Sequence, residues 1–336
     1  MWISKWMSKQ VSIVLSLKTS FILYKKIRSM IFFSCFFSQL CLAGPQIQII
    51  SFNILAPCYA HPDLYPKGAL PLLDRNVRRE RIFSFLQSIA PTTDIISLQE
   101  TTQMEFRYIQ EFLQENFSGF EVYHDQKYWS DWNTPDLEWE PNGVAIFLKK
   151  TSFDRMQFQD LPLSNSGNHG AYFEALHRAS DIDIRGASIH FDSDRASHRN
   201  QELKALLSYM TPNPHKVDII AGDFNYGTHA GITKRYLSQN RFTDVLHEVY
   251  QRKLGMQGIE YYEEWTSPYS IGIYRDKNLG IIDHITVRRA KAADGQVINF
   301  NLWSLYPYNE DARILASLKV SGSDHFPIRA VIEVSP

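Results

Sequence analysis

The pattern of apolar and polar positions predicts a mixture of strands and helices. Residues 46–54 (QIQIISFNI) alternate and then become continuously apolar, which is typical of a central strand. Over residues 76–89, Ile82, Phe85 and Leu86 recur at helical spacing and predict an amphipathic helix. Further strands are predicted over 94–99, 143–150, 181–191, 217–223, 282–289 and 325–334, and further helices over 104–117 and 197–210.

Strands outnumber helices, and helices separate only some of the strands. Packed sheets flanked by helices fit this pattern better than one strictly alternating parallel sheet. The chain has 336 residues, 44% of them hydrophobic, which is enough for a sizeable core. No repeat or long linker divides it, so the sequence predicts one large domain, residues 44–336, after an N-terminal extension.

Polar side chains able to take part in chemistry lie at the ends of most predicted strands. Each one alone is weak evidence, because Asn and Asp at a strand end are more often turn formers than catalysts. Six such endings in one chain favour a shared site, provided that the strand ends meet at one edge. The residues concerned are Asn53, Glu100, His190, Asp223, Asn225, Asp283, Asp324 and His325.

This set combines carboxylate and amide oxygens with imidazole rings. Hard oxygen ligands suit Mg²⁺ or Mn²⁺, which keep several waters and bind phosphate oxygens directly. A zinc site is less favoured, because the chain has no H-E-x-x-H motif and Cys58 is the only cysteine after the extension. A Ser-His-Asp hydrolase is disfavoured by the lack of a G-x-S-x-G motif.

Seven short motifs occur in an order that resembles one enzyme superfamily. SFNIL, SLQE, GVAIF, SIHF, GDFN, IDHI and SDHFPI follow one another between residues 46 and 334. They are similar to the motifs of the endonuclease/exonuclease/phosphatase superfamily, which includes DNase I-like nucleases, inositol-polyphosphate 5-phosphatases, neutral sphingomyelinases and deadenylases. SFNILAPCYA, NVRRERIFSFL and NGVAIFLKKTSF resemble the deadenylase branch most closely. That branch usually has Asp where this chain has Asn142, which bears on the substrate rather than on the chemistry.

The resemblance implies a fold and a set of metal ligands. The expected fold is an α/β four-layer αββα sandwich of the DNase I-like type, with two packed mixed sheets flanked by helices. Glu100 would be the main Mg²⁺ ligand with Asn53 beside it, and Asp324 would orient the site or ligate a metal.

The resemblance also implies catalytic roles. Asp223 would orient or deprotonate the attacking water, and Asn225 would hold the phosphate or a second ion. His190 would donate to a non-bridging phosphate oxygen. His325, polarised by Asp283, would contact the scissile phosphate. Donors of this kind stabilise the charge that develops on the phosphoryl oxygens during hydrolysis.

Residues 255–281 are rich in aromatic side chains, lack periodicity and are predicted to form a surface loop. These side chains either stack on a base or sugar of the substrate or pack onto the sheet. Trp265 from this loop and Asn142 are the candidates for substrate binding.

Histidines outside the motifs, among them His124 and His177, are predicted to be surface or loop residues. Asp192 and Asp194 could contact a metal, but capping of the helix that begins near residue 197 is the favoured prediction.

The N-terminal extension differs in composition from the rest of the chain. Residues 1–43 contain six Lys and Arg and no Asp or Glu, and the KKIR cluster precedes the apolar stretch MIFFSCFFSQLCLAG. This order predicts a signal peptide cut near Ala43, and hence a secreted or periplasmic protein. The alternatives are a membrane anchor, for which the apolar run is short, or a buried first helix.

Removal of this extension would leave 29 Lys and Arg against 36 Asp and Glu, a net charge of −7 instead of −1. An acidic protein binds long polyanions poorly without specific contacts, because it releases few condensed counterions. This charge mildly favours small or short substrates over long duplex DNA.

Three functions are consistent with these observations. The favoured one is a Mg²⁺-dependent phosphodiester hydrolase, a phosphoric ester hydrolase acting as a nuclease on single-stranded nucleic acid. It would be a monomer without an obligate protein partner. The second is a phosphatase or phospholipase-type enzyme acting on inositol phosphates, sphingomyelin or another small phosphoester. The third is an inactive secreted binding module, which the intact set of site residues argues against.

Overall fold

The computed structural model describes residues 44–125, 140–165, 167–226, 231–254, 266, 281–306 and 309–335. The chain divides into two units, Met1–Gly44 and Pro45–Pro336, and every element described below lies in the second unit. Within the described ranges no helix is long and apolar enough to cross a membrane. The predicted signal peptide lies outside these ranges.

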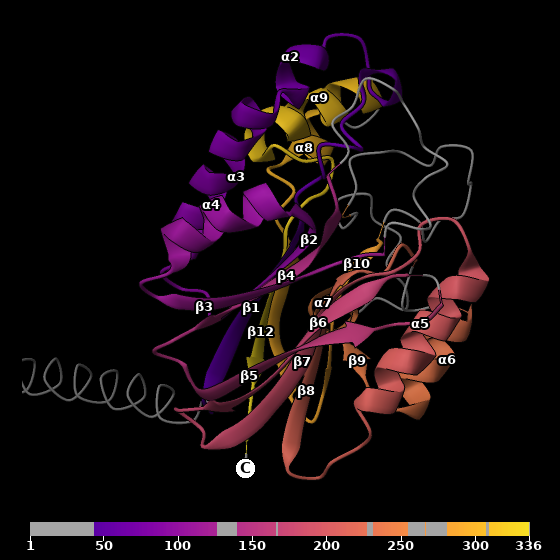
Figure 1. Cartoon of the computed structure of the whole chain (residues 1–336). Coiled ribbons are helices and arrows are strands. Elements are labelled where there is room, and N and C mark those ends of the chain that lie inside the picture. Colours follow the sequence, from indigo (N-terminus) through magenta and orange to yellow (C-terminus); the bar gives the residue numbers. More distant parts are fainter. Residues whose placement is uncertain are drawn as a thin grey trace, which may run out of the picture. The chain divides into compact units, whose positions relative to one another are not determined.

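Two mixed β-sheets, each six-stranded in the described part of the chain, form the centre of the second unit (Figure 1). Their strand orders are β11-β12-β1-β2-β4-β3 and β5-β6-β7-β8-β10-β9. The first sheet consists of β1 (Gln46–Asn53), β2 (Ile95–Thr102), β3 (Phe117–Tyr123), β4 (Asn142–Lys149), β11 (Lys291–Val297) and β12 (Ile328–Glu333). The second consists of β5 (Phe153–Pro162), β6 (His169–His177), β7 (Ile182–His190), β8 (Lys216–Asp223), β9 (Thr243–Asp244) and β10 (Asp283–Arg288). The pairs β1–β2 and β7–β8 are parallel, and the other neighbours are antiparallel.

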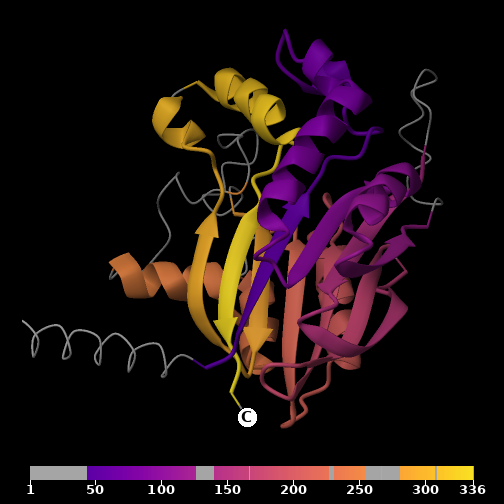
Figure 2. The same cartoon turned by 90° about the vertical axis from the view of Figure 1, so that its left-hand side faces the viewer.

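Helices cover the outer face of each sheet, which confirms the predicted four-layer αββα sandwich (Figures 1 and 2). The helices α3 (Arg75–Ile89) and α4 (Gln103–Leu113) pack on the first sheet. The helices α5 (Ala196–Tyr209) and α6 (Gly231–Gln239) pack on the second. The remaining elements are η1 (Pro62–Leu64), α2 (Leu70–Leu73), α7 (Val245–Leu254), α8 (Leu302–Leu305) and α9 (Glu310–Ser321).

The core between the sheets is built from alternating side chains. In β4, Val144, Ile146 and Leu148 belong to this inter-sheet core. Ala145 and Phe147 face the other way, toward α3 and α4. A strand buried on both faces requires a continuous apolar run, which explains the sequence GVAIFL. Burial on both faces also fixes the register, because a slip of one residue would exchange the two faces.

The sequence-based assignment missed several elements, among them β3, β5, β6, β11, α6, α7 and α9, and it misplaced one helix end. The predicted helix over 104–117 ends at Leu113, where the Asn116 N–H donates to the Leu113 carbonyl, and Phe117 begins β3. Strand β5 was not predicted. It lies at a sheet edge, where only Phe153 and Leu161 of its side chains are buried, so its apolar pattern is weak.

Gly222, the residue before Asp223 at the end of β8, permits β8 to lie close to β7. Its φ is +154°, and a Cβ atom there would lie 1.9 Å from the Ile189 carbonyl oxygen. We expect Gly222→Ala to lower the free energy of unfolding by about 3 kcal/mol or more, because backbone atoms of two strands must separate. Thermal unfolding checks this. Gly295→Ala, where the nearest atom lies at 3.4 Å, is the matched control. Equal Tm values for the two variants would contradict the expectation.

Candidate active site

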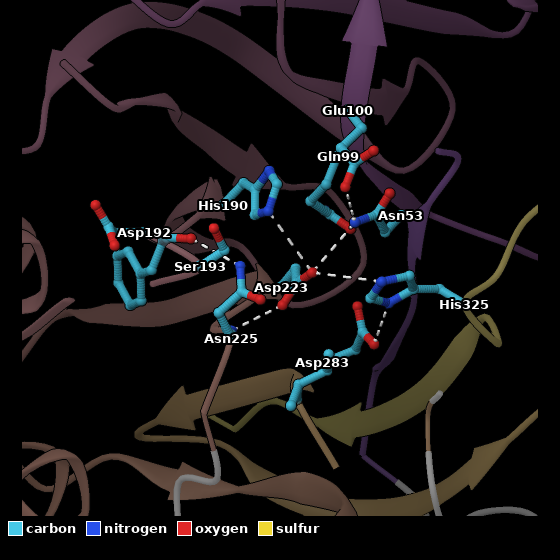
Figure 3. A network of polar contacts seen from close by, with 12 residues as sticks. Asn53, Gln99, Glu100, His190, Asp192, Ser193, Asp223, Asn225, Asp283 and His325 are labelled. Carbon is cyan, nitrogen blue, oxygen red and sulfur yellow. Dashed lines mark hydrogen bonds and ion pairs between the residues drawn. The ribbon is translucent and has the colours of Figure 1, made fainter. Parts of the chain in front are cut away.

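Strand register brings predicted site residues from both sheets to one edge. His190 at the end of β7 pairs with Asp223 at the end of β8. Asp223 in turn pairs with Asp283 at the start of β10. Asn53 ends β1 in the opposite sheet. The side chains of these four residues point toward one another in Figure 3.

The Asp223 carboxylate lies at the centre of this network (Figure 3). Its Oδ2 accepts a hydrogen bond from Asn53 Nδ2 at 3.1 Å and lies 3.7 Å from Nε2 of His190 and of His325. Its Oδ1 accepts from the backbone N–H of Asn225 at 2.7 Å. A separation of 3.7 Å exceeds a hydrogen bond. Neither Nε2 atom therefore forms a hydrogen bond with Asp223.

A β-bulge in β2 sets the direction of the Glu100 side chain. The pairing of β2 with β4 shifts register between Gln99 and Thr101, and Glu100 itself has φ +56°. Bulges of this kind redirect a side chain relative to the regular strand. Glu100 Oε1 accepts from Asn53 Nδ2 at 2.8 Å, and Oε2 accepts from the Ala56 N–H at 2.8 Å. Asn53 therefore links the Glu100 and Asp223 carboxylates.

His325 forms a buried pair with Asp283. Its Nδ1 lies 2.8 Å from Asp283 Oδ2, and the Asp283 N–H donates to Thr266 Oγ1 at 3.2 Å. Burial acts to lower the pKa of His325, but the charge and hydrogen bond of Asp283, together with Asp223 and Asp324, raise this pKa well above its usual value. His325 thus keeps a proton on Nε2, the nitrogen that faces Asp223.

The loop that carries Asp324 and His325 is held to β1 by side-chain hydrogen bonds. Ser323 Oγ donates to the Asn53 carbonyl at 2.7 Å and accepts from the His325 N–H at 3.1 Å. Tyr65 Oη donates to Asp324 Oδ2 at 2.9 Å. Asp324 Oδ1 is buried and has no hydrogen-bond partner among the residues that the structure describes.

The acidic groups at this edge fit a divalent cation. Carboxylate oxygens of Asp223 and Asp283 lie within 4.8 Å of each other. Burial raises the pKa of Glu100, and the negative charge of Asp324 adds to this effect. A bound cation would offset that concentration of buried negative charge. The oxygen-rich donor set matches Mg²⁺ or Mn²⁺.

Three further residues were predicted for the site: Asn225, Asn142 and Trp265. Asn225 has φ +51°, and its Nδ2 donates to the Phe191 carbonyl at 2.8 Å. Its side chain therefore joins the loop after β8 to the loop after β7. Its predicted phosphate contact stays a prediction. Asn142 begins β4 and is buried beside Cys58. Trp265 lies outside the described residues.

Arg78 is a residue of this site that the sequence reasoning missed. Its buried guanidinium donates to Gly322 O at 2.9 Å, to Ile54 O at 2.8 Å and to Leu55 O. These carbonyls belong to the loops after β1 and after α9, which flank Asn53 and Asp324. One sequence feature could have identified Arg78: it lies one turn before Ile82, on the apolar face of the helix.

Two predictions for residues outside the motifs were wrong. His177 is a buried residue of β6, not a surface or loop residue. His124 lies in the loop after β3, as predicted, but it is buried. Asp192 does not cap α5: its Oδ1 accepts from the N–H groups of Asp194 and Arg195, which closes the turn before the helix. Arg195 is the N-cap residue and has no side-chain capping bond.

Residues 50–325 match the model of the Endonuclease/Exonuclease/phosphatase family. The chain belongs to this family. Its members are phosphoester hydrolases, the enzyme class that the sequence predicts, and they generally use a divalent metal. No curated protein sequence matches the chain.

Solved structures of family members have the same fold. ANGEL2, described as a 2',3'-cyclic phosphatase, is 15% identical with a TM-score of 0.58, covering 86% of this chain and 95% of that one. The human Nocturnin catalytic domain is 15% identical with a TM-score of 0.58, covering 86% and 94%. D. rerio TDP2, complexed with single-strand DNA product, is 14% identical with a TM-score of 0.51, covering 85% and 98%.

Proposed function

We propose that the protein is a Mg²⁺-dependent phosphodiester hydrolase that acts on single-stranded nucleic acid as a monomer. The observation that carries this proposal is the position of the Asp223 carboxylate. One of its oxygens lies 3.7 Å from Nε2 of both His190 and His325. A general base and two donors for phosphate oxygens thereby converge on one point.

Each side chain has a defined task in this mechanism. Asp223 accepts a proton from the attacking water. His190 and His325 donate from Nε2 to phosphoryl oxygens and stabilise the charge that develops there. The Asp283 carboxylate fixes the His325 ring through Nδ1 at 2.8 Å. Glu100, with Asp324, would hold the metal ion, which supplies electrostatic stabilisation of the phosphoryl oxygens and the leaving oxygen.

The choice of substrate rests on two further observations. TDP2 is described in complex with single-strand DNA product, and ANGEL2 in complex with adenosine-2',3'-vanadate. The net charge of −7 without residues 1–43 disfavours tight binding of long duplexes.

We also propose that residues 1–43 direct export of the protein, which N-terminal sequencing of protein from the producing cell tests. An intact residue 1 would contradict export.

A small nucleotide phosphoester is the second candidate substrate. The description of ANGEL2 as a 2',3'-cyclic phosphatase favours it. The same arrangement of Asp223 and two imidazoles would accept a cyclic phosphate, because the reaction again requires a water and donors to the phosphoryl oxygens. Inositol phosphates and sphingomyelin complete the set of alternatives.

Removal of divalent cations with EDTA is expected to lower the rate by about 10²-fold or more, with recovery on addition of Mg²⁺. The measurement is a panel of oligo(A), single- and double-stranded DNA, adenosine 2',3'-cyclic phosphate, inositol phosphates and sphingomyelin, each with and without the ion. Full activity in EDTA would contradict the metal mechanism. Cleavage of the small phosphoesters alone would replace the proposed substrate, and no cleavage at all would favour a binding module.

A further inference from the structure

His124 and Asn142 are cross-strand neighbours at the polar edge of the first sheet. Tyr123 pairs with Gly143 in the antiparallel β3–β4 ladder, and the next residue, His124, donates its N–H to Asn142 O at 3.0 Å. Residues directly opposite in such a ladder project from the same face, with Cβ atoms about 5 Å apart. The two side chains therefore lie together.

This face is the one that meets the second sheet. Val122 and Val144, each two residues away, belong to the inter-sheet core, and alternate residues of a strand share a face. The His124 ring lies beside the ring of His190 in β7, with centroids 6.0 Å apart. The pair therefore lies next to His190, one of the two residues proposed to contact the phosphate.

The Asn142 side chain lies beside two residues of the segment that follows β1. Asn142 Nδ2 lies 3.5 Å from both Cys58 Sγ and Tyr59 Oη. Burial raises the pKa of Cys58 to about 12, and the nearby Glu100 charge contributes to this. His124 thus lies beside His190, and Asn142 lies beside Cys58, whose pKa the Glu100 charge raises.

Each of the two side chains has one buried polar atom without a partner in the described part of the chain. His124 and Asn142 are 5% and 4% exposed, and the atoms concerned are His124 Nε2 and Asn142 Oδ1. His124 Nδ1 accepts the N–H of His169 at 3.0 Å, so the ring proton is on Nε2. The two neighbouring residues thus supply one unpaired donor and one unpaired acceptor. Buried polar groups are nearly always paired, and an exception calls for an explanation.

We propose that His124 Nε2 and Asn142 Oδ1 form a subsite for one uncharged hydroxyl group of the substrate, the sugar 2'-hydroxyl next to the scissile phosphate. A hydroxyl both accepts and donates, so it satisfies both atoms at once, whereas a carbonyl or an ammonium group satisfies one. This inference rests on the proposed function. It predicts that the enzyme prefers ribonucleotide to deoxyribonucleotide substrates.

The electrostatics of the subsite agree with an uncharged ligand. Burial lowers the pKa of His124 well below its usual value, and the charges of His190 and His169 add to this effect, so its ring is neutral near pH 7. Asn142 is uncharged. Neither residue would compensate the charge of a second phosphate, so the phosphate contacts stay with His190 and His325.

The test compares three versions of one oligonucleotide with the full-length protein and Mg²⁺: oligo(A), its 2'-deoxy form and its 2'-fluoro form. The 2'-fluoro form retains an electronegative substituent but cannot donate a hydrogen bond. We expect kcat/KM for oligo(A) to exceed that for each analogue by about 10- to 100-fold. In His124→Phe and in Asn142→Leu the ratio should fall to within about threefold of one, because a hydrogen bond to the hydroxyl is lost.

The ratio of two rates on one preparation does not depend on how much of the variant is folded. His177→Phe, which removes another buried histidine from the second sheet, is the control and should keep the wild-type ratio. Equal rates on all three substrates by the wild type, or a wild-type ratio in both variants, would overturn the subsite while the proposed function stands. Failure to cleave any of the three would overturn the nucleic-acid substrate and the subsite together.

Discussion

Replacement of Asp223 by Asn is expected to lower kcat by about 10³- to 10⁴-fold with little change in the melting temperature. Asn has the same shape as Asp, so it can occupy the position between Asn53, His190 and His325. Its amide cannot take the proton of the attacking water, and it lacks the negative charge that both imidazoles face. Single-turnover hydrolysis of oligo(A) measures the chemical step without product release.

The control for this variant is an Asp→Asn change outside the site. Asp183 lies in β7 like His190, but near the opposite end of the strand, where its half-exposed side chain pairs with Arg155. Asp183→Asn should keep the wild-type rate. If Asp223→Asn retained a rate within about threefold of the wild type, Asp223 would not be the general base.

Replacement of Asp283 by Asn is expected to lower kcat by about 10²- to 10³-fold and to change the dependence of the rate on pH. Asp283 is the main cause of the raised pKa of His325, through its charge and its hydrogen bond to Nδ1. Without that carboxylate the imidazole loses its proton at lower pH. It then ceases to be a cationic donor to the phosphate.

The direction of the pH effect follows from the raised pKa. In the wild type, the His325 cation persists above its usual titration range, so activity should fall only when the pH rises through the raised value. In Asp283→Asn this alkaline fall should begin about one pH unit or more lower. The stability that His325 contributes is likewise fully present below its unfolded-state pKa and is lost as the pH rises through the folded-state value. An unchanged alkaline limit in the variant would show that Asp283 does not control His325.

The sequence was sufficient to predict the fold and most of the polar edge, because both depend on local patterns. The runs before Asn53 and Asp223 are apolar on both faces, which identifies them as central strands and places the polar residues at their ends. Glu100 was found for the same reason, although the bulge that directs its side chain is not visible in the sequence.

The contacts that hold the site together could not be predicted, because they join distant parts of the chain. Arg78 donates to Gly322, 244 residues away, and Tyr65 donates to Asp324 across 259 residues. His124 belongs to no motif and follows an unpredicted strand, so only the packing of the two sheets brings it to His190. A polar residue whose partner is fixed by tertiary packing leaves no periodic signal.

The most direct test of the account is the hydrolysis of oligo(A) in water enriched in ¹⁸O, with Mg²⁺ and after removal of the ion by EDTA. If a water molecule activated by Asp223 attacks phosphorus, the product phosphate gains one ¹⁸O atom per cleavage, and product forms only with the ion. Product without ¹⁸O in the phosphate would show attack by another group or cleavage of a different bond. That result, or an unchanged rate in EDTA, would contradict metal-assisted attack by water at this centre.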